Sequence, residues 1–410
     1  MNDKASAKRL QIFNFKLNAL LEITQAINSN LSVQELLDRY QNILRGELKI
    51  GRILIFKYKV VWECILDTNV LENNKNKIDV ETDLKPFTDI CFISSSENPA
   101  LKAYDIVIPV YNNYVPIAYV LIGDIDEEME GVSPVIKHLK FIQTISNIII
   151  VAIENIRLFN ESLRQEALKK ELELASRMQN MLIPKKELLP HTGQLFMTSF
   201  YMPHFEVGGD YYDYIRMDEN EFGFCIADVS GKGMSAAILM SNFQATLRAL
   251  FTKEIPLKTL VERLNERVLS NANGEKFITL FIGRYNQKTH ELEYINAGHN
   301  PPILYDIQAK RLEMLKSGCV GMGMLDRLPF VVRGNIVLSG SSKLLCYTDG
   351  LVELLEGENI QIATKVLEEE IANDKSIEEN ISSIIIKQSI TEGNPAIFDD
   401  ITMLGIQITF

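Results

Sequence analysis

A polar, helix-forming stretch near the middle of this chain separates two regions with different hydrophobic patterns. The stretch, NESLRQEALKKELELASRMQNMLIP, carries a thin apolar stripe that repeats in alternating steps of four and three residues, which is coiled-coil spacing. Pro184 ends the stretch, because proline cannot continue a helix. A stripe this short also fits an ordinary amphipathic helix. We predict a dimeric helical connector over residues 161–185, whose stripe consists of Leu168, Leu172, Ala175, Gln179 and Leu182.

The region before the connector changes its hydrophobic period twice. Residues 17–27 show apolar positions at helical spacing. GRILIFKYKVVWECIL then predicts two strands, and DIVIPVYNNYVPIAYVLIGD predicts a hairpin around Asn112 and Asn113. Residues 133–159 return to helical spacing. Helix, strands and helix in this order predict an α/β sandwich domain over residues 15–160, preceded by a tail over residues 1–14.

The region after the connector, residues 186–410, is rich in predicted strands. Helices lie between groups of strands, at Met234–Phe251, Leu257–Asn271, Ile360–Ile371 and around Ile377–Ile390. This order predicts a β-sandwich flanked by helices, so the fold class of the whole chain is α+β. The predicted strands are Leu195–Tyr201, Glu221–Ala227, Phe277–Tyr285, Leu292–Asn296, Leu344–Tyr347 and Ile401–Ile408.

The charge and cysteine content exclude several kinds of protein. The net charge of −12 does not favour binding of nucleic acid or anionic membrane through bulk charge. The five cysteines are scattered without a CxxC pair, which favours reduced thiols over a disulfide framework. MNDKASAKRLQ lacks the apolar core of a signal peptide, and the longest apolar run, Ile148 to Ile153, is too short to cross a bilayer. We therefore expect a cytoplasmic protein.

Four acidic positions stand at the ends of predicted strands, each beside a glycine or another turn former. An isolated Asp-Gly pair is usually only a turn. Four carboxylates gathered in one cleft would repel each other unless hard divalent cations such as Mg²⁺ or Mn²⁺ lay between them. Two such ions roughly 3.5–4 Å apart can share a water and lower its pKa. The four positions are Asp210 in EVGGDYYDY, Asp228 in CIADVSGKGMSAA, Asp349 in LLCYTDGLVE and Asp399 in FDDIT.

The turn after Asp228 has its own signature. SGKG runs from a strand into a helix, and its glycines permit close backbone approach, so the helix start could offer amides to an anion. The pattern is not a Walker A loop, which requires GxxxxGK followed by Ser or Thr. Lys232 is equally compatible with a solvated side chain and with a contact to a substrate phosphate.

Taken in order, VGGDYYD, ADVSGKGMSAA, NAGHNPP, TDG and DDIT resemble the PPM-type phosphatases of the SpoIIE-like branch. The resemblance covers residues 166–410. It implies a metal-dependent phosphatase that hydrolyses phosphoserine or phosphothreonine on a small partner protein, of the kind that antagonises anti-sigma factors. It also implies two bound ions, Mn²⁺ or Mg²⁺.

The resemblance assigns roles to individual residues. Asp228 resembles the aspartate that bridges both ions, and the carbonyl of Val229 resembles a further ligand. Asp349 and Asp399 resemble the other ligands of the first ion, and Asp210 resembles the outer aspartate that completes the site. The wider group holds phosphate with an upstream arginine, whereas Met202–Pro203–His204 occupies that stretch here. In NAGHNPP, a turn that shapes the sandwich explains the motif as well as a catalytic His299 would.

The region before the connector resembles a GAF domain, through ALLEITQAINSNLSVQELL at its start and SNIIIVAIENIRLFNE at its end. The resemblance implies a sensor that binds a small ligand or acts as a dimerising scaffold. Two other functions stay open at this point. The phosphatase-like region could be an inert interaction module, or a two-metal hydrolase of nucleotides or small phosphate esters.

Overall fold

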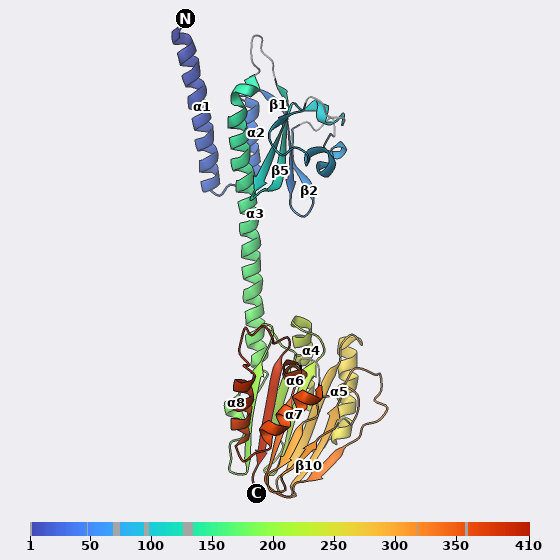
Figure 1. Ribbon diagram of the computed structural model, residues 1–410. Helices are drawn as coiled ribbons and strands as arrows, with labels where there is room; N and C mark the ends of the chain where they lie inside the picture. The colour runs from blue at the N-terminus through green and yellow to red at the C-terminus, as the bar shows by residue number, and fades with distance from the viewer. Residues whose placement is uncertain are drawn as a thin grey trace. The chain divides into compact units, whose positions relative to one another are not determined.

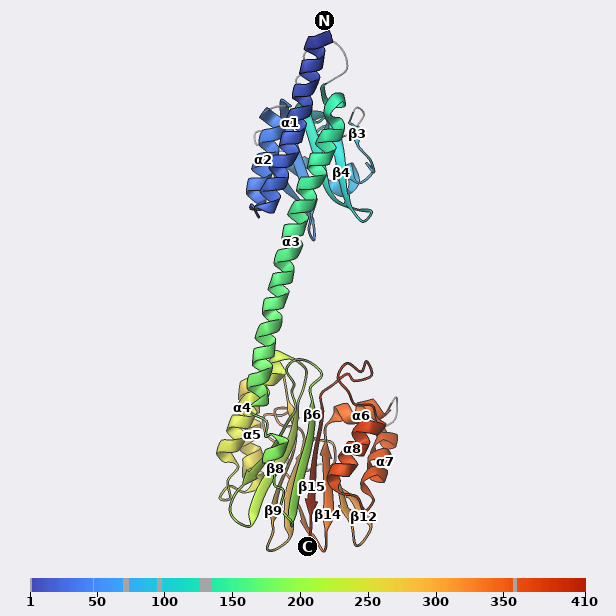
Figure 2. The same cartoon turned by 90° about the vertical axis from the view of Figure 1, so that its left-hand side faces the viewer.

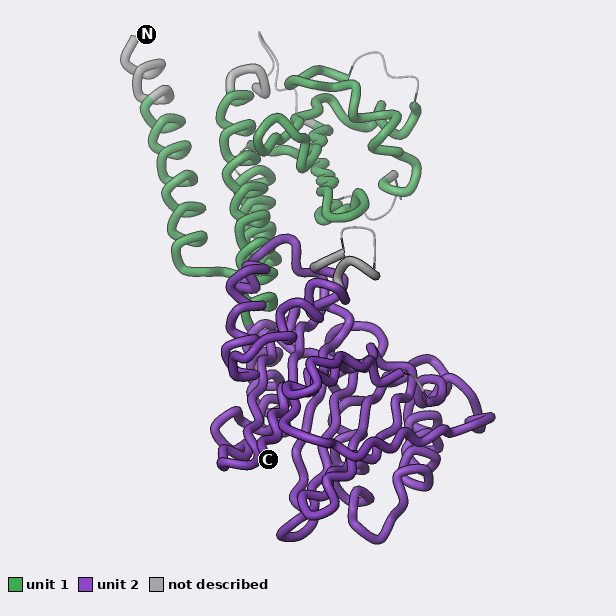
Figure 3. The backbone as a smooth tube through the Cα atoms, turned by 60° about the horizontal axis from the view of Figure 1, so that its bottom comes forward, with its two compact units in different colours: residues 1–166 green, residues 167–410 purple. Residues whose placement is uncertain are grey.

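The chain divides into two compact units, residues 1–166 and 167–410 (Figure 3). The computed structural model describes residues 2–46, 48–68, 74–93, 98–125, 134–316, 318–356 and 360–410. Helix α1 (Asn2–Asn28) runs through the boundary predicted at residue 14. Helix α3 (Pro134–Asn180) is continuous across residue 166 and includes most of the predicted connector.

The N-terminal unit is built on a five-stranded antiparallel sheet in the order β2-β1-β5-β4-β3. Figure 1 labels β1, β2 and β5 of this sheet, and Figure 2 labels β3 and β4. The predicted hairpin joins β4 to β5, and Asn113 and Tyr114 at its turn have φ values of 45° and 68°. Both central residues of such a two-residue turn need positive φ, and asparagine tolerates this better than most residues. The strands are β1 (Ile50–Tyr58), β2 (Trp62–Asp67), β3 (Cys91–Phe92), β4 (Ile106–Asn112) and β5 (Val115–Ile125).

Successive residues of β1 face opposite sides of this sheet, and each side has its own core. Ile53 and Ile55 pack with α1, α2 (Val33–Gly46) and α3. Leu54 and Phe56 pack with the short helical turns at Val80–Leu84 and Leu101–Ala103. A third short turn, Asn74–Lys77, precedes these two. This alternation confirms the predicted α/β layering of the unit.

One ion pair in this unit is buried between the sheet and α3. The Lys57 ammonium, which is 1% exposed, donates to the carboxylate of Glu154 on α3. Arg157 donates to the same carboxylate, with Nη2 2.7 Å from Oε1. The two cations together hold the pKa of Glu154 below its usual value, with the Arg157 hydrogen bond contributing most.

Part of α3 is markedly apolar. Within the described residues, the stretch His138–Asn180 is long and apolar enough in composition to span a bilayer. Half of its most apolar window is buried, and Ile142, Ile145 and Ile149 belong to the core of the N-terminal unit. A core helix of this composition would show the same pattern.

We predict that Lys57→Met destabilises the N-terminal unit by about 2–4 kcal/mol, because it leaves a buried carboxylate with only one partner. Hydrogen exchange of β1 and β5 amides in the full chain measures this loss. The double variant Lys57→Met/Glu154→Leu should recover most of it, since no unpaired charge remains. A double variant as unstable as Lys57→Met would contradict the ion-pair explanation.

The C-terminal unit contains two five-stranded antiparallel sheets (Figure 2). The first has the order β12-β11-β14-β15-β6 and the second β13-β10-β9-β8-β7. The first contains β6 (Leu195–Met202), β11 (Ile303–Asp306), β12 (Arg311–Met314), β14 (Ser342–Tyr347) and β15 (Ile401–Ile408). The second contains β7 (Tyr211–Arg216), β8 (Glu221–Val229), β9 (Ile278–Asn286), β10 (Glu291–Ala297) and β13 (Gly334–Val337).

The two sheets pack face to face, and helices cover their outer faces. Leu344 and Ile406 share the inner core with Phe224 of the other sheet, whereas Leu345 and Met403 of the same two strands face α6–α8. The helices α4 (Met234–Leu250) and α5 (Leu257–Ala272) contact the β7–β10 sheet. On the other side lie α6 (Asp349–Glu356), α7 (Ile360–Ile371) and α8 (Ile377–Lys387) (Figure 2). The predicted β-sandwich flanked by helices is confirmed.

Candidate metal centre

Both sheets of the C-terminal unit contribute to one cluster of carboxylates. Asp228 lies near the end of β8, and Asp210 immediately precedes β7 in the same sheet. Asp349 follows β14 and opens α6, and Asp399 lies just before β15 in the other sheet. The charges of Asp349 and Asp399 raise the pKa of Asp228, and the charge of Asp228 raises that of Asp210. The structure thus brings the four predicted aspartates together.

Asp210 is the most deeply buried of the four and is held from the opposite sheet. Its Oδ2 accepts hydrogen bonds from Thr348 Oγ1 at 2.9 Å and from Thr402 Oγ1 at 2.5 Å. The Thr402 amide donates in turn to Thr348 Oγ1 at 3.0 Å. These contacts fix the carboxylate at the junction of β14 and β15, because Thr402 belongs to β15 and Thr348 directly follows β14.

Asp400, the second aspartate of FDDIT, holds the turn that carries Asp210. Its carboxylate accepts from the His204 amide at 2.7 Å and from the Gly209 amide at 2.6 Å. Gly209 also lies against the Val229 carbonyl, since a Cβ there would be 2.9 Å from that oxygen. The Gly-Gly pair before Asp210 is therefore needed for close approach to the strand that carries Asp228.

The start of α6 approaches the same segment. A Cβ on Gly350 would stand 2.2 Å from the carbonyl oxygen of Asp400 and 3.2 Å from Cβ of Asp399. Glycine after Asp349 thus lets the helix start lie directly against the Asp399–Asp400 pair. The TDG motif therefore supplies both the Asp349 carboxylate and the glycine that this close packing needs.

The carboxylates perturb one another strongly. Burial raises the pKa of Asp228 to about 7, and the nearby charges of Asp349, Asp399 and Asp400 add to the rise. Burial and the charge of Asp228 likewise raise the pKa of Asp210 well above its usual value. Burial and Asp399 raise the pKa of Asp349. Like charges in a poorly solvated cleft favour protonation or a bound cation.

One cationic group already partners this cluster. Lys232 Nζ lies 2.9 Å from Oδ2 of Asp399 and also donates to the Phe398 carbonyl. Its ammonium is therefore engaged at the cluster itself, and its predicted contact with a substrate phosphate stays a prediction. A positive charge beside Asp399 is the counter-charge that the carboxylates require.

The donor set fits hard divalent cations. Carboxylate and carbonyl oxygens are the ligands that Mg²⁺ and Mn²⁺ prefer, and the cluster supplies both kinds. Within the described parts of the chain, no group of three or more histidine, cysteine or acidic side chains stands, as it is, in an arrangement that could hold a metal ion. The residues that would hold cations are Asp210, Asp228, Val229 through its carbonyl, Asp349 and Asp399.

His299 of NAGHNPP lies inside the sandwich. Its Nδ1 is 2.8 Å from Oγ1 of Thr279 on β9, and Thr279 pairs with Asp228 in the β8–β9 register. Burial lowers the pKa of His299 to about 4, so the ring is neutral near pH 7. Gly298 has a φ of 66°, as the predicted turn requires. The position of His299 favours support of the strand pair over contact with substrate.

One residue of the predicted connector stripe belongs to the site's surroundings. Gln179 is 5% exposed, and its amide makes two hydrogen bonds to the backbone of Gly208. Nε2 donates to the Gly208 carbonyl at 2.5 Å, and the Gly208 amide donates to Oε1 at 3.1 Å. Gly208 is two residues before Asp210. The sequence pattern placed Gln179 only in a dimer stripe and gave no sign of this contact.

Comparison with known families agrees with this geometry. Residues 218–409 match the family model described as Stage II sporulation protein E (SpoIIE). The C-terminal unit is a SpoIIE-family domain of the PPM (PP2C) phosphatase fold, as the motifs predicted.

Several bacterial proteins match this chain. Phosphoserine phosphatase RsbU of Bacillus subtilis is 32% identical over 156 residues, which cover 36% of this chain and 46% of that protein. Phosphoserine phosphatase RsbP of the same organism is 26% identical over 189 residues, covering 45% of this chain and 46% of that protein. The chain thus spans less than half the length of these curated relatives. The SiaA-PP2C domain of Pseudomonas aeruginosa superposes with a TM-score of 0.50 at 18% identity, covering 60% of this chain and 98% of that one.

We predict that Asp228→Asn raises the melting temperature of the protein in EDTA at pH 8 by roughly 3 °C or more. The folded-state pKa lies above the ordinary value of 3.8. The contribution of the protonated Asp228 carboxyl to stability is therefore complete below about pH 4, and it is lost as the pH rises through about 7. The gain from the substitution should accordingly shrink between pH 8 and pH 5, as measured by thermal unfolding at each pH.

Asp400→Asn is the matched control. It also removes a like charge from the cluster, but it takes an acceptor from one of two backbone amides, so it should raise the melting temperature less than Asp228→Asn does under the same conditions. If both substitutions destabilised the protein equally, mutual repulsion would not be the main influence of Asp228 on stability.

Proposed function

We propose that this protein is a Mn²⁺- or Mg²⁺-dependent protein serine/threonine phosphatase. The observation that carries the proposal is the cluster of mutually repelling carboxylates, drawn from both sheets in the order of the SpoIIE-like motifs. The naming of two relatives as phosphoserine phosphatases supports the same activity.

The chain's own groups divide the work. Asp228, Asp349 and Asp399, with the Val229 carbonyl, would hold the cations, and Asp210 would complete the site. Bound cations supply polarisation of phosphoryl oxygens and a lowered pKa of water for in-line attack. Thr348 and Thr402 keep Asp210 in place, and Asp400 keeps the Gly208–Gly209 turn against β8. No side chain of the cluster needs to become phosphorylated.

We expect EDTA to abolish hydrolysis of a phosphoserine peptide, and added Mn²⁺ to restore it. Asp228→Asn should lower kcat by at least about 10²-fold, because it removes a carboxylate that would hold the cations. Mn²⁺ should raise the melting temperature of the wild type and not of Asp228→Asn, a readout independent of turnover.

Substrate comparison separates this proposal from its alternatives. A phosphoprotein phosphatase should hydrolyse phosphoserine and phosphothreonine peptides faster than nucleotides. Faster hydrolysis of nucleotides would indicate a small-ester hydrolase, and Mn²⁺ binding without turnover of any substrate would indicate an inert interaction module.

The proposal includes regulation by the N-terminal unit. We infer that this unit is a GAF-type sensor for a small ligand, that the chain forms a cytoplasmic homodimer through the connector, and that the substrate is a phosphorylated STAS-type partner like the anti-sigma-factor antagonists. The layered sheet of the N-terminal unit and the stripe of α3 support the first two inferences. The Gln179–Gly208 contact supplies a route by which α3 would act on Asp210.

We predict that Gln179→Leu changes kcat/KM by about fivefold or more, because it unlinks α3 from the turn before Asp210. Met178→Leu, at a neighbouring position that is 70% exposed, is the control and should have little effect.

Leu172→Asp with Leu182→Asp should abolish the dimer in sedimentation and alter activity. A dimeric double variant of unchanged activity would mean that the connector is only a tether.

A further inference from the structure

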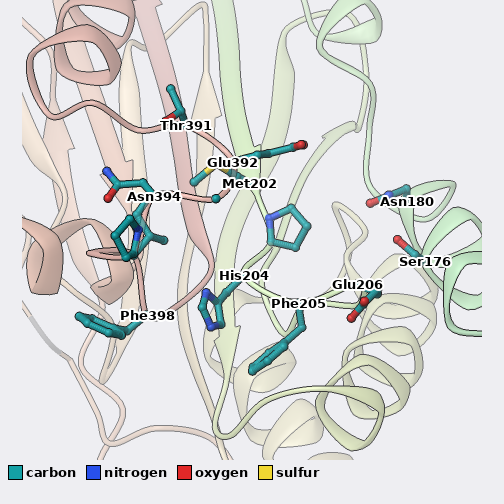
Figure 4. A pocket seen from close by; sticks show the side chains of 14 residues that line it. Ser176, Asn180, Met202, His204, Phe205, Glu206, Thr391, Glu392, Asn394 and Phe398 are labelled. Carbon is teal, nitrogen blue, oxygen red and sulfur yellow. The ribbon is translucent and has the colours of Figure 1, made fainter. Parts of the chain in front are cut away.

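A cavity of about 800 Å³ opens in the C-terminal unit beside the carboxylate cluster (Figure 4). Three segments line it: the last turns of α3, the loop over residues 202–206 after β6, and residues 391–398 before β15. None of the four aspartates of the metal centre lines this cavity, so it is a separate feature of the surface.

Two of these segments also carry the candidate metal centre. The His204 amide donates to Asp400 at 2.7 Å, and Phe398 is the residue before Asp399. The carbonyl of Phe398 accepts from Lys232, the cation beside Asp399. A chain segment that occupied the cavity would therefore lie against two segments that also contact the carboxylate cluster.

The cavity presents apolar rings that a folded domain ordinarily buries. Phe205 is 47% exposed and Phe398 is 67% exposed. Figure 4 shows them on the two sides of His204, whose ring centroid is 4.5 Å from that of Phe205. Two exposed aromatic rings at the edge of a concave site are typical anchors for a partner's apolar side chain.

The cavity is also acidic. Glu206 and Glu392 line it, and neither has an ion-pair partner among the residues that the structure describes. A partner segment with a basic side chain would complement them. A segment of acidic side chains would be repelled both here and by the neighbouring aspartates.

We propose that this cavity is the docking site for the polypeptide that flanks the phosphorylated residue, and that it selects an apolar and a basic side chain there. The inference rests on the proposed phosphatase function and adds the substrate class to it. Phe205 and Phe398 are then specificity-determining residues with no part in the hydrolysis itself.

The test compares two synthetic phosphoserine peptides and p-nitrophenyl phosphate on the full-length protein with Mn²⁺. One peptide places leucine and arginine beside the phosphoserine, and the other places glycine and glutamate there. The wild type should prefer the first peptide by about tenfold or more in kcat/KM. Phe205→Ala/Phe398→Ala should lower kcat/KM on the first peptide by at least about tenfold, through a higher KM. Its turnover of p-nitrophenyl phosphate should stay within about twofold of the wild-type value. Ile386→Ala, at an exposed position on α8, is the control and should behave as wild type.

A second pair of substitutions tests charge independently of packing. Glu206→Lys/Glu392→Lys should shift the preference toward the glutamate peptide. Equal use of both peptides by an active wild type, or equal losses on peptide and p-nitrophenyl phosphate in the aromatic variant, would overturn the docking site and leave the phosphatase proposal standing. An absence of turnover on all three substrates would instead overturn the phosphatase proposal.

Discussion

The candidate metal centre of the C-terminal unit depends on holding together carboxylates that repel one another. Asp228 has Asp349, Asp399 and Asp400 as its charged neighbours, and each raises its pKa beyond the effect of burial. Holding these like charges together costs folding free energy. The contacts that do so leave the carboxylates little freedom to move. Threonine hydroxyls fix Asp210, glycines let three segments meet, and Lys232 places one positive charge beside Asp399. Such an arrangement favours cation binding at the expense of stability.

Much of this architecture can be predicted from the sequence, because apolar residues recur at regular spacings along most of the strands and helices. The strand predicted at Glu221–Ala227 is found at Glu221–Val229, and the helix predicted at Leu257–Asn271 ends at Ala272. The strands β11, β12 and β13 have four residues each, which is too short to establish a period, and sequence analysis missed them. The aspartates of the site were visible because each stands in a glycine-containing or otherwise distinctive motif.

The supporting contacts were not predictable, because they join residues far apart in the chain. Thr348 and Thr402 reach Asp210 across 138 and 192 positions, and Asp400 reaches Gly209 across 191. Their residue types are common and carry no local signal. For Gln179, the sequence indicated the position but not the contact. Its place in a four-three stripe was evident, but the bond that it makes to Gly208 depends on a loop 29 residues away.

Because α3 is one continuous helix from Pro134 to Asn180, the number of residues between two of its positions fixes the angle between them around the helix axis. Gln179 near the end of α3 is held by Gly208, and Leu168 and Leu172 of the predicted stripe lie on the same helix within the C-terminal unit. Each added or removed residue turns everything beyond it by about 100° around the helix axis. A change of seven residues would leave the direction of Gln179 within about 20° of the original, whereas a change of two would turn it by about 200°. A change in length between Leu172 and Gln179 therefore keeps these two residues on one face of α3 only in steps that preserve this angle, unlike a change in a flexible linker.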